Sequence, residues 1–400
     1  MTTNRDVLER WERSVMHSYG TPAVALVRGS GARVWDAEGI EYLDMVAGIA
    51  VNAVGHAHPL VIEAVTRQLS LLGHTSNLAA TLPNIELAER LLDLSGRGSE
   101  GRIFFCNSGA EANEAALKIA RRSGRPEVVV AHGAFHGRTM GALSWTAQPA
   151  KQIPFLPLPG EVSVVPFGDV DALAGVVSER TAAVVLEPIQ GEGGVIVPPE
   201  GYLAEVATIC RERGALFILD EVQTGIGRTG WWFAHLRDGL EPDVMMLAKG
   251  LAGGMPIGAC VAWGPASSFL TPGMHGSTFG GNPVTCAAAL AVLNVIETEQ
   301  LLPRVASLER SLGDGLLAGA GELATQVRGR GLLLGVVLAG DHAAKVEAAA
   351  RAHGLLVNAI GPDLIRLAPP LTLTDDDVRD CLERWEAAMA DVRRDLESAP

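Results

Sequence analysis

Short apolar runs alternate with longer alanine-rich stretches through the middle of this 400-residue chain. Apolar runs of about five residues are typical of buried strands, and the stretches between them are typical of helices that cover a sheet. We expect strands at residues 127–131, 182–186, 215–219, 244–248 and 258–263. Because strands and helices alternate, the pattern predicts an α/β fold with a largely parallel sheet between about residues 101 and 262.

The pattern changes after this region. The stretches expected there are helices at 283–299, 301–319, 341–353 and 375–396, and strand-like segments at 326–338 and 364–367. Near the start of the chain, 33–35 and 42–44 predict a hairpin because turn residues lie between them. We therefore predict a large domain over residues 46–299 and a smaller α+β domain that joins residues 1–45 to 300–400.

The composition of the chain is typical of a globular protein and argues against nucleic-acid and membrane partners. Hydrophobic residues make up 48% of the chain, and 46 acidic against 32 basic side chains give a formal net charge of -14. A surface of that sign repels nucleic-acid phosphates. The first residues lack the apolar core of a signal peptide, and no apolar run reaches the roughly 20 residues that span a bilayer. We expect a cytoplasmic protein without a nucleic-acid or membrane partner.

Charged residues stand directly behind two of the expected strands. Lys249 follows the run 244–248, and Asp220 with Glu221 ends the run 215–219. Burial disfavours the ammonium form of a lysine and lowers its pKa, so Lys249 would attack a carbonyl near neutral pH. The other three lysines are expected in helical stretches or in a proline-containing loop and lack this setting: Lys118, Lys345 and Lys151.

An amine and a carboxylate at two strand ends suit pyridoxal phosphate. Ligands of open α/β sheets bind at the carboxyl ends of the strands. The aldehyde of this cofactor requires a lysine, here Lys249. Its pyridine nitrogen requires a carboxylate, here Asp220, because a protonated ring withdraws the electrons released when a substrate C–H bond breaks. Taken alone, either residue is more typical of an ordinary charged strand end than of a cofactor site.

Two segments of small residues are candidates for binding the cofactor phosphate. Residues 107–110 open a helix directly after a strand, and backbone N–H groups at such a helix start favour an anion. Asn and Ser are also ordinary N-cap residues, so a structural interpretation stays open. The loop at 275–283 would add hydroxyl groups, and a purely structural loop is its alternative.

Aromatic and basic residues elsewhere would contact the ring and the substrates. Phe135 follows the strand at 127–131 and can stack on a pyridine face, while Arg138 can bind a carboxylate. Arg366 lies inside an apolar strand and requires an anion, for which Glu192 is a candidate. For an arginine in a strand taken by itself, a structural ion pair is a more typical explanation than a substrate site. No combination of His, Cys and acidic residues has the spacing of a metal site.

Together, these segments resemble the class III pyridoxal-phosphate-dependent aminotransferases, and within them the branch that acts on acetylornithine. The resemblance covers nearly the whole chain. Its most specific stretch runs from Leu219 to Gly225 and is followed, at the family's spacing, by Ala248, Lys249 and Gly250. Supporting stretches lie at 22–42, 50–59, 107–111, 135–139, 187–194 and 276–283.

The resemblance implies a fold-type I homodimer that binds pyridoxal 5'-phosphate in active sites shared between the subunits. Lys249 and Asp220 would be catalytic. The cofactor-binding residues would be Ser108, Gly109, Ala110, Phe135, Asp220, Glu221, Val222, Gln223, Lys249 and, from the other subunit, Thr278. The residues near the substrates would be Arg138, Ser277, Glu192 and Arg366, and no metal is expected.

The resemblance also implies a reaction: transfer of the 5-amino group of N2-acetyl-L-ornithine to 2-oxoglutarate in arginine biosynthesis. Arg138 would bind the α-carboxylate of the donor. Arg366 would bind 2-oxoglutarate, and Glu192 would pair with Arg366 while the donor is bound. Ile49 stands where ornithine aminotransferases carry a tyrosine, which favours an acylated ornithine. A 4-aminobutyrate aminotransferase, an enzyme for other acyl-ornithines or acyl-diaminopimelate, and a non-catalytic relative that uses the fold for binding remain alternatives.

Overall fold

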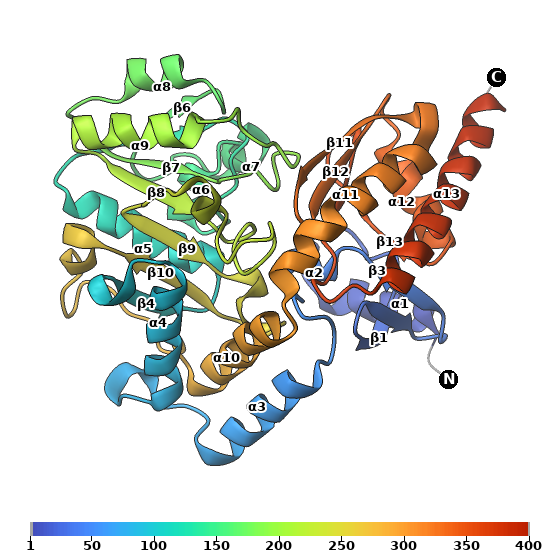
Figure 1. Cartoon of the computed structure of the whole chain (residues 1–400), viewed down its shortest axis with the longest axis horizontal. Helices are drawn as coiled ribbons and strands as arrows, with labels where there is room; N and C mark the ends of the chain where they lie inside the picture. Colours follow the sequence, from blue (N-terminus) through green and yellow to red (C-terminus); the bar gives the residue numbers. More distant parts are fainter. Residues whose placement is uncertain (1–2, 399–400) are drawn as a thin grey trace.

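A computed structural model describes residues 3–398 of the chain and shows two lobes (Figure 1). One lobe is built on a seven-stranded sheet, and the other holds two four-stranded sheets. Helix α10 (Pro283–Thr298) leads from the first lobe to the second, where helix α11 (Leu301–Ala320) continues the chain. The sequence pattern predicted both helices to within about one residue at each end.

The seven-stranded sheet is mostly parallel, which confirms the α/β prediction. In spatial order its strands are β4 (Arg102–Cys106), β10 (Gly258–Ala262), β9 (Val244–Leu247), β8 (Leu216–Asp220), β7 (Thr181–Leu186), β5 (Glu127–Ala131) and β6 (Glu161–Val165). Strand β10 pairs antiparallel with β4 and β9, and all other neighbours pair parallel. The apolar run at 258–263 predicted a strand there, but apolar content carries no information on strand direction.

Helices cover both faces of this sheet. Helix α5 (Gly109–Arg122) packs on one face through Ala112, Ala116 and Ile119. On the other face, α8 (Val170–Val176) and α9 (Tyr202–Arg213) share a core with the strands. Because both faces are covered, β7, β9 and β10 are buried at every position, which explains why their sequences are continuously apolar.

The remaining helices of this lobe pack around its edges. Helices α3 (Pro59–Leu71) and α4 (Leu82–Leu94) pack on α10. The short helices α6 (Met140–Trp145) and α7 (Pro149–Gln152) follow strand β5 in the chain. Helix α7 corrects the expectation of a loop around Lys151: one helical turn begins at Pro149, a residue favoured at the first position of a helix.

The other lobe combines both ends of the chain. Strands β1 (Leu26–Ser30), β2 (Arg33–Asp36) and β3 (Glu41–Asp44) form a sheet with β13 (Leu355–Leu356), and the β2–β3 hairpin confirms the prediction at 33–35 and 42–44. The second sheet has the order β11 (Ala324–Arg330), β12 (Leu333–Leu338), β15 (Leu364–Leu367) and β14 (Asn358–Ala359). Helices α12 (Ala343–Ala352) and α13 (Asp375–Glu397) pack against each other and, with β13, beside these sheets.

The segment at 326–338 is a hairpin and not one strand, which corrects the sequence interpretation. Strands β11 and β12 pair antiparallel, and Gly331 turns the chain between them with φ 58°. Strand β12 is apolar whereas β11 is mostly polar, and the glycine with positive φ between them is the local signal that marks the turn.

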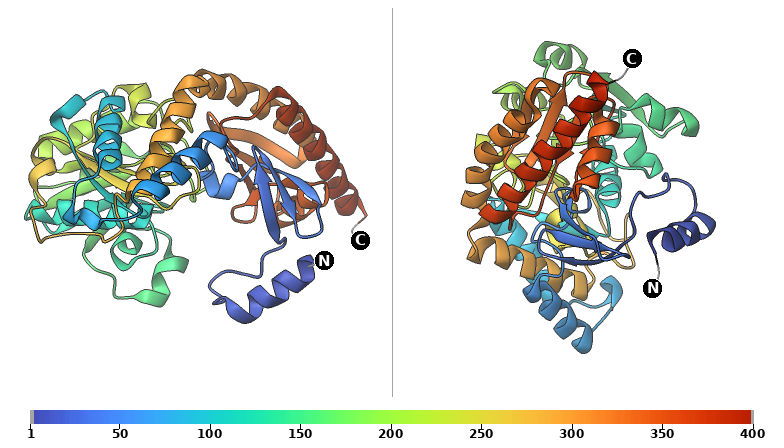
Figure 2. Two further views of the ribbon diagram at one scale, coloured as in Figure 1. Left: turned by 90° about the horizontal axis from the view of Figure 1, so that it is seen from below. Right: turned by 90° about the vertical axis from the view of Figure 1, so that its right-hand side faces the viewer.

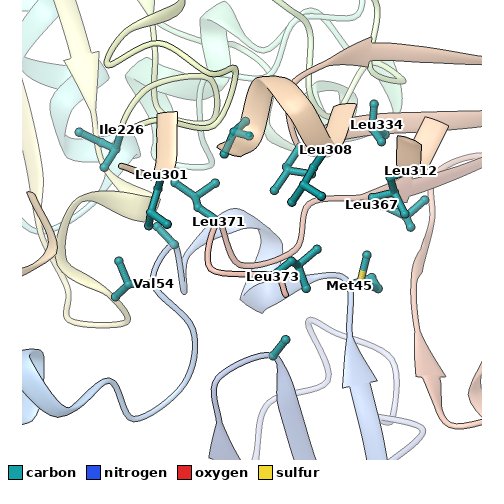
Figure 3. Packing of buried hydrophobic residues seen from close by; sticks show 14 of the residues in the cluster. Met45, Val54, Ile226, Leu301, Leu308, Leu312, Leu334, Leu367, Leu371 and Leu373 are labelled. Atoms are coloured by element: carbon teal, nitrogen blue, oxygen red, sulfur yellow. The ribbon is translucent and has the colours of Figure 1, made fainter. Parts of the chain in front are cut away.

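One large apolar cluster extends from this lobe into the seven-stranded lobe. Leu301, Leu308 and Leu312 of α11 belong to the same buried cluster as Met45 and Leu371, and Figure 3 shows these side chains close together. The loops and strands that lead to Met45 and Leu371 are thus fixed by the same core as α11.

Two elements near the N-terminus are unusual. Helix α1 (Asn4–Ser14) has no buried residue. Its first residue is tied to β2, where Asn4 Nδ2 donates to Asp36 Oδ2 at 2.8 Å, and the rest of the helix extends away from the strands (Figure 2). The turn α2 (Ala47–Ala50) is left-handed, with φ of 50° at Ala47, 66° at Gly48, 64° at Ile49 and 62° at Ala50. Left-handed backbone costs a non-glycine residue roughly 1–2 kcal/mol, so the surrounding packing must hold this turn in place.

Within residues 3–398, no single helix is long and apolar enough to cross a membrane. Helix α10 and the segment that begins at Leu301 are together long and apolar enough to span a membrane, but the chain bends by 68° between them.

Candidate active site

A cavity of about 450 Å³ lies at the ends of strands β8 and β9 and contains both Lys249 and Asp220. The structure brings most of the residues predicted from the sequence to its walls. They are Ser108, Gly109, Ala110, Phe135, Arg138, Glu192, Asp220, Val222, Gln223 and Lys249. These residues come from segments up to about 140 positions apart, and the parallel strand order aligns their ends at one edge of the sheet.

Lys249 follows strand β9 and begins a short turn at Lys249–Ala252. Burial lowers the pKa of its ammonium group to about 8, with a further lowering by the charge of Arg366 and a partial compensation by Glu192. A larger share of Lys249 is therefore neutral near physiological pH than of an exposed lysine. The neutral amine is the form that attacks a carbonyl.

Asp220 ends strand β8 and is 4% exposed. Its Oδ2 accepts hydrogen bonds from Asn113 Nδ2 at 3.0 Å and from His136 Nδ1 at 2.7 Å, and its Oδ1 accepts one from the backbone N–H of Val222 at 3.0 Å. Burial lowers the pKa of His136, but the hydrogen bond and the charge of Asp220 outweigh it and raise that pKa. The carboxylate is thus held in one orientation from three sides.

His136 and Asn113 are residues that the sequence analysis did not select. His136 directly follows Phe135, and Asn113 lies one turn inside helix α5, where its amide also donates to Gly109 O at 3.0 Å. Neither carries a local signal, because a histidine after a strand and an asparagine in a helix are common. Only the approach of α5 and of the segment after β5 to Asp220 shows their role.

Glu187 is a third residue that sequence analysis left without a role. Its carboxylate accepts hydrogen bonds from the backbone N–H groups of Phe135 and Gly191, both at 3.0 Å. It therefore joins the segment that carries Phe135 to the loop that carries Glu192. Burial raises the pKa of Glu187 to about 7, although the charge of His136 lowers it.

The start of helix α5 forms the floor of the cavity. Ser108 is the N-cap, and its hydroxyl accepts a hydrogen bond from the backbone N–H of Glu111 at 3.2 Å. A Cβ at Gly109 would lie only 2.9 Å from a methyl group of Val222, so the close approach requires glycine. Backbone N–H groups of the first helical turn lack partners within the helix and attract an anion.

Arg366 and Glu192 form the ion pair that the sequence suggested. Arg366 is 2% exposed, and its guanidinium also donates to Gln223 Oε1 at 3.2 Å and to Asn358 Oδ1 at 2.7 Å. Burial raises the pKa of Glu192, but the charges of Arg366 and then of Lys249 hold it below its usual value. The wall of the cavity therefore contains Glu192, whose carboxylate is paired with the buried guanidinium of Arg366.

Three of the sequence-selected residues lie elsewhere. Glu221 points away from the cavity: its carboxylate accepts from His235 Nδ1 at 3.0 Å and from two backbone N–H groups, so the cofactor-binding assignment of Glu221 gains no support from its position. Adjacent residues at a strand end point to opposite sides, which separates Glu221 from Asp220. Ser277 and Thr278 line a different hollow beside Asn107, and Ser277 Oγ accepts from Asn107 Nδ2 at 3.1 Å.

The chemistry of the cavity fits pyridoxal phosphate. It offers an amine with a lowered pKa, a buried carboxylate in fixed orientation, and a helix start that attracts an anion. Within residues 3–398, His136 Nε2 and Asn113 Oδ1 are buried without a hydrogen-bond partner, so the polar groups beside the carboxylate are not fully satisfied by the protein. Among the described residues, no group of three or more His, Cys, Asp or Glu side chains could hold a metal ion.

Comparisons with known proteins agree with this chemistry. The model of the family Aminotransferase class-III matches residues 15–389. The acetylornithine aminotransferase of Mycobacterium tuberculosis is 60% identical over 374 residues, which cover 94% of each chain. Among solved structures, the ornithine aminotransferase from Toxoplasma gondii superposes with a TM-score of 0.94 at 34% identity, over 99% of this chain and 97% of the other. The acetylornithine aminotransferase from Elizabethkingia anophelis reaches a TM-score of 0.87 at 34% identity, over 98% and 100%.

Proposed function

Since the chain belongs to the class-III aminotransferases, we propose that it transfers the 5-amino group of N2-acetyl-L-ornithine to 2-oxoglutarate, giving N-acetyl-L-glutamate 5-semialdehyde and L-glutamate. It is a pyridoxal-phosphate-dependent enzyme. The observation that carries the chemistry is the placement of Lys249 and Asp220 in one cavity. The observation that favours this donor is the 60% identity to an acetylornithine aminotransferase over 94% of both chains. We place the reaction in arginine biosynthesis.

Each residue of the cavity has a separate role in this proposal. Pyridoxal phosphate, when bound, supplies a ring that accepts the electron pair released from the substrate C–H bond. Lys249 would hold the aldehyde end of the cofactor, and its neutral amine would serve as the base for the proton on the substrate carbon. Asp220, oriented by His136 and Asn113, keeps a proton on the ring nitrogen. The N-terminal turn of α5 binds the phosphate through Ser108, Gly109 and Ala110, and Phe135 packs against the ring.

The charged pair explains how one cavity can accept two unlike substrates. Arg138 binds the α-carboxylate of the donor, which directs the distal amine toward Lys249. During that half-reaction Glu192 neutralises Arg366. When 2-oxoglutarate enters, its distal carboxylate replaces Glu192 on Arg366. A buried guanidinium left without an anion would be costly, so one of the two carboxylates must always be present.

We also propose a cytoplasmic homodimer in which Thr278 completes the phosphate site of the other subunit. Thr278 is exposed and lies outside the cavity of its own chain. Apolar side chains near this loop are also exposed, including Phe279 at 61% and Leu78 at 95%. Asn77, next to Leu78, donates to Gly280 O at 3.0 Å, which ties the two segments together. An exposed apolar surface of this kind is typical of a protein interface.

The first test is the visible absorbance of the purified protein with pyridoxal phosphate, before and after N2-acetylornithine or 4-aminobutyrate is added. We expect the absorbance of the bound aldehyde form to be lost with N2-acetylornithine and to return with 2-oxoglutarate. The variant Lys249→Ala should lose transamination, because both the cofactor anchor and the proton carrier are absent. A change with 4-aminobutyrate alone would favour that substrate, and transamination by Lys249→Ala would contradict the assigned mechanism.

A further inference from the structure

Lys151 lies beside the cavity, although neither its sequence context nor the family resemblance points to it. Its Nζ is 5.5 Å from the centre of the Phe135 ring, and the guanidinium carbon of Arg138 lies at the same distance from that ring. Phe135 and Arg138 both line the cavity that holds Lys249. Helix α7 therefore brings a second cation to the wall where the carboxylate of the donor is expected.

The two cations have no anionic partner among residues 3–398. Lys151 Nζ donates a hydrogen bond to the neutral side-chain oxygen of Gln148, and no ion pair involves either Lys151 or Arg138 within this range. Burial lowers the pKa of Lys151, and the charge of Arg138 lowers it further, while Glu192 partly offsets both. Lys151 and Arg138 repel each other, and an anion that contacts both would offset this repulsion.

The hollow at Lys151 and the cavity of Lys249 share the wall residue Glu192. Lys151 lines this hollow, of about 430 Å³, together with Gln148 and Arg328. Under the proposed function, the end of the donor opposite to its amine lies at Arg138, which flanks the same Phe135 ring as Lys151. In N2-acetylornithine that end carries the α-carboxylate and the acetamide.

We propose that Lys151 is a specificity-determining residue that, together with Arg138, binds the α-carboxylate of the amine donor. The inference rests on the proposed function. An arginine binds a carboxylate through its planar fork, and a lysine adds a mobile point charge on a flexible stem. Arg138 is exposed, which leaves its guanidinium free to move toward a shared anion. Lys151 thus selects donors that have a carboxylate at the end opposite to the amine.

The test uses the holoenzyme and a ligand that cannot react. N2-acetyl-L-norvaline keeps the α-carboxylate and the acetamide of the proposed donor but lacks the amine. Its Kd is measured by calorimetry for the wild type, Lys151→Gln and Lys151→Arg. Lys345→Gln is the matched control, because it removes one positive charge from an exposed site on α12. N-butylacetamide, which lacks the carboxylate, reports general damage to the cavity.

We expect Lys151→Gln to weaken binding of N2-acetyl-L-norvaline by about tenfold, as for the loss of one hydrogen bond to a charged group. Lys151→Arg should restore most of that loss, Lys345→Gln should bind like the wild type, and N-butylacetamide should not distinguish the variants. Three results would overturn the inference: an unchanged Kd in Lys151→Gln, no recovery in Lys151→Arg, or an equal loss for N-butylacetamide.

Failure of the proposed function has a separate signature. If the wild type neither binds N2-acetyl-L-norvaline nor transaminates N2-acetylornithine, the donor assignment is wrong and the role of Lys151 falls with it. If the wild type does both and Lys151→Gln binds as tightly, only the role of Lys151 is wrong.

Discussion

Lys249 adopts a backbone conformation that L-amino acids seldom take, with φ 41°. Such a residue carries roughly 1–3 kcal/mol of strain, which the surrounding packing must offset. Gly250 follows it, and a Cβ there would lie 3.3 Å from the Cβ of Ala53, so this segment fits tightly against the chain that follows the left-handed turn α2. Strain and burial together fix the amine at the cavity and limit its hydration.

The lowered pKa of Lys249 predicts a pH dependence for cofactor capture. The rate at which the cofactor-free protein captures pyridoxal phosphate should rise with pH, reach half of its maximum near pH 8, where half of the amine is neutral, and level off about one pH unit higher. The measurement is the visible absorbance after rapid mixing over a pH series. A rate that keeps rising toward pH 10.5, the ordinary pKa of a lysine, would show that Lys249 is solvated like an exposed lysine.

Arg366 is expected to separate the two half-reactions. Arg366→Ala should slow the half-reaction with 2-oxoglutarate by more than tenfold relative to the half-reaction with the donor, because the guanidinium contacts a substrate only in the former. Single-turnover kinetics with each substrate measure the two losses, and Arg379→Ala, an exposed arginine paired with Asp376, serves as control. Equal losses in both halves would contradict exchange of carboxylates on Arg366.

Side-chain hydrogen bonds at helix ends set where helices begin, and such a cap can be tested at a helix far from the active site. Helix α13 begins with a capping box in which the Thr374 hydroxyl accepts from Asp377 N at 3.1 Å and the Asp377 carboxylate accepts from Thr374 N at 3.1 Å. Thr374→Ala should lower the free energy of unfolding by about 1 kcal/mol. The midpoint of urea unfolding measures this change.

Thr298→Ala is the control for that variant, because Thr298 is also exposed but its hydroxyl bonds a carbonyl at the end of a helix. We expect little change in its unfolding midpoint. Equal shifts in the two variants would mean that the effect arises from helix propensity and not from the cap.

At the scale of the whole molecule, the exposed position of Thr278 predicts active sites that combine residues of two subunits. Lys249→Ala and Thr278→Glu should each be inactive, since the first lacks the amine and the second places a carboxylate where a phosphate is expected. A hybrid dimer of the two variants should contain one site with both native residues. We expect it to show about half of the wild-type activity.

Co-expression with two different affinity tags isolates that hybrid dimer. If it is no more active than the parent variants, Thr278 does not act across the interface. If no dimer forms from the wild-type chain, the homodimer itself is wrong.

The sequence alone determined the features that depend on local environment. A strand buried on both faces must be apolar along its length, so β5, β7, β8 and β9 could be located from the chain. A charged residue at the end of such a strand is unusual enough to select Lys249 and Asp220. Agreement of several such segments in order supplied the family, and with it the cofactor and the donor.

Only the tertiary structure decided which side chains meet. His136 and Asp220 are 84 positions apart, and their hydrogen bond exists because two strands and a helix bring their ends together. Packing between distant segments likewise sets the direction of the Glu221 side chain, the antiparallel course of β10 and the approach of Lys151 to Phe135. Periodicity reports how deeply a residue is buried. It carries no information on the neighbour that buries it, and that neighbour sets the chemistry of the site.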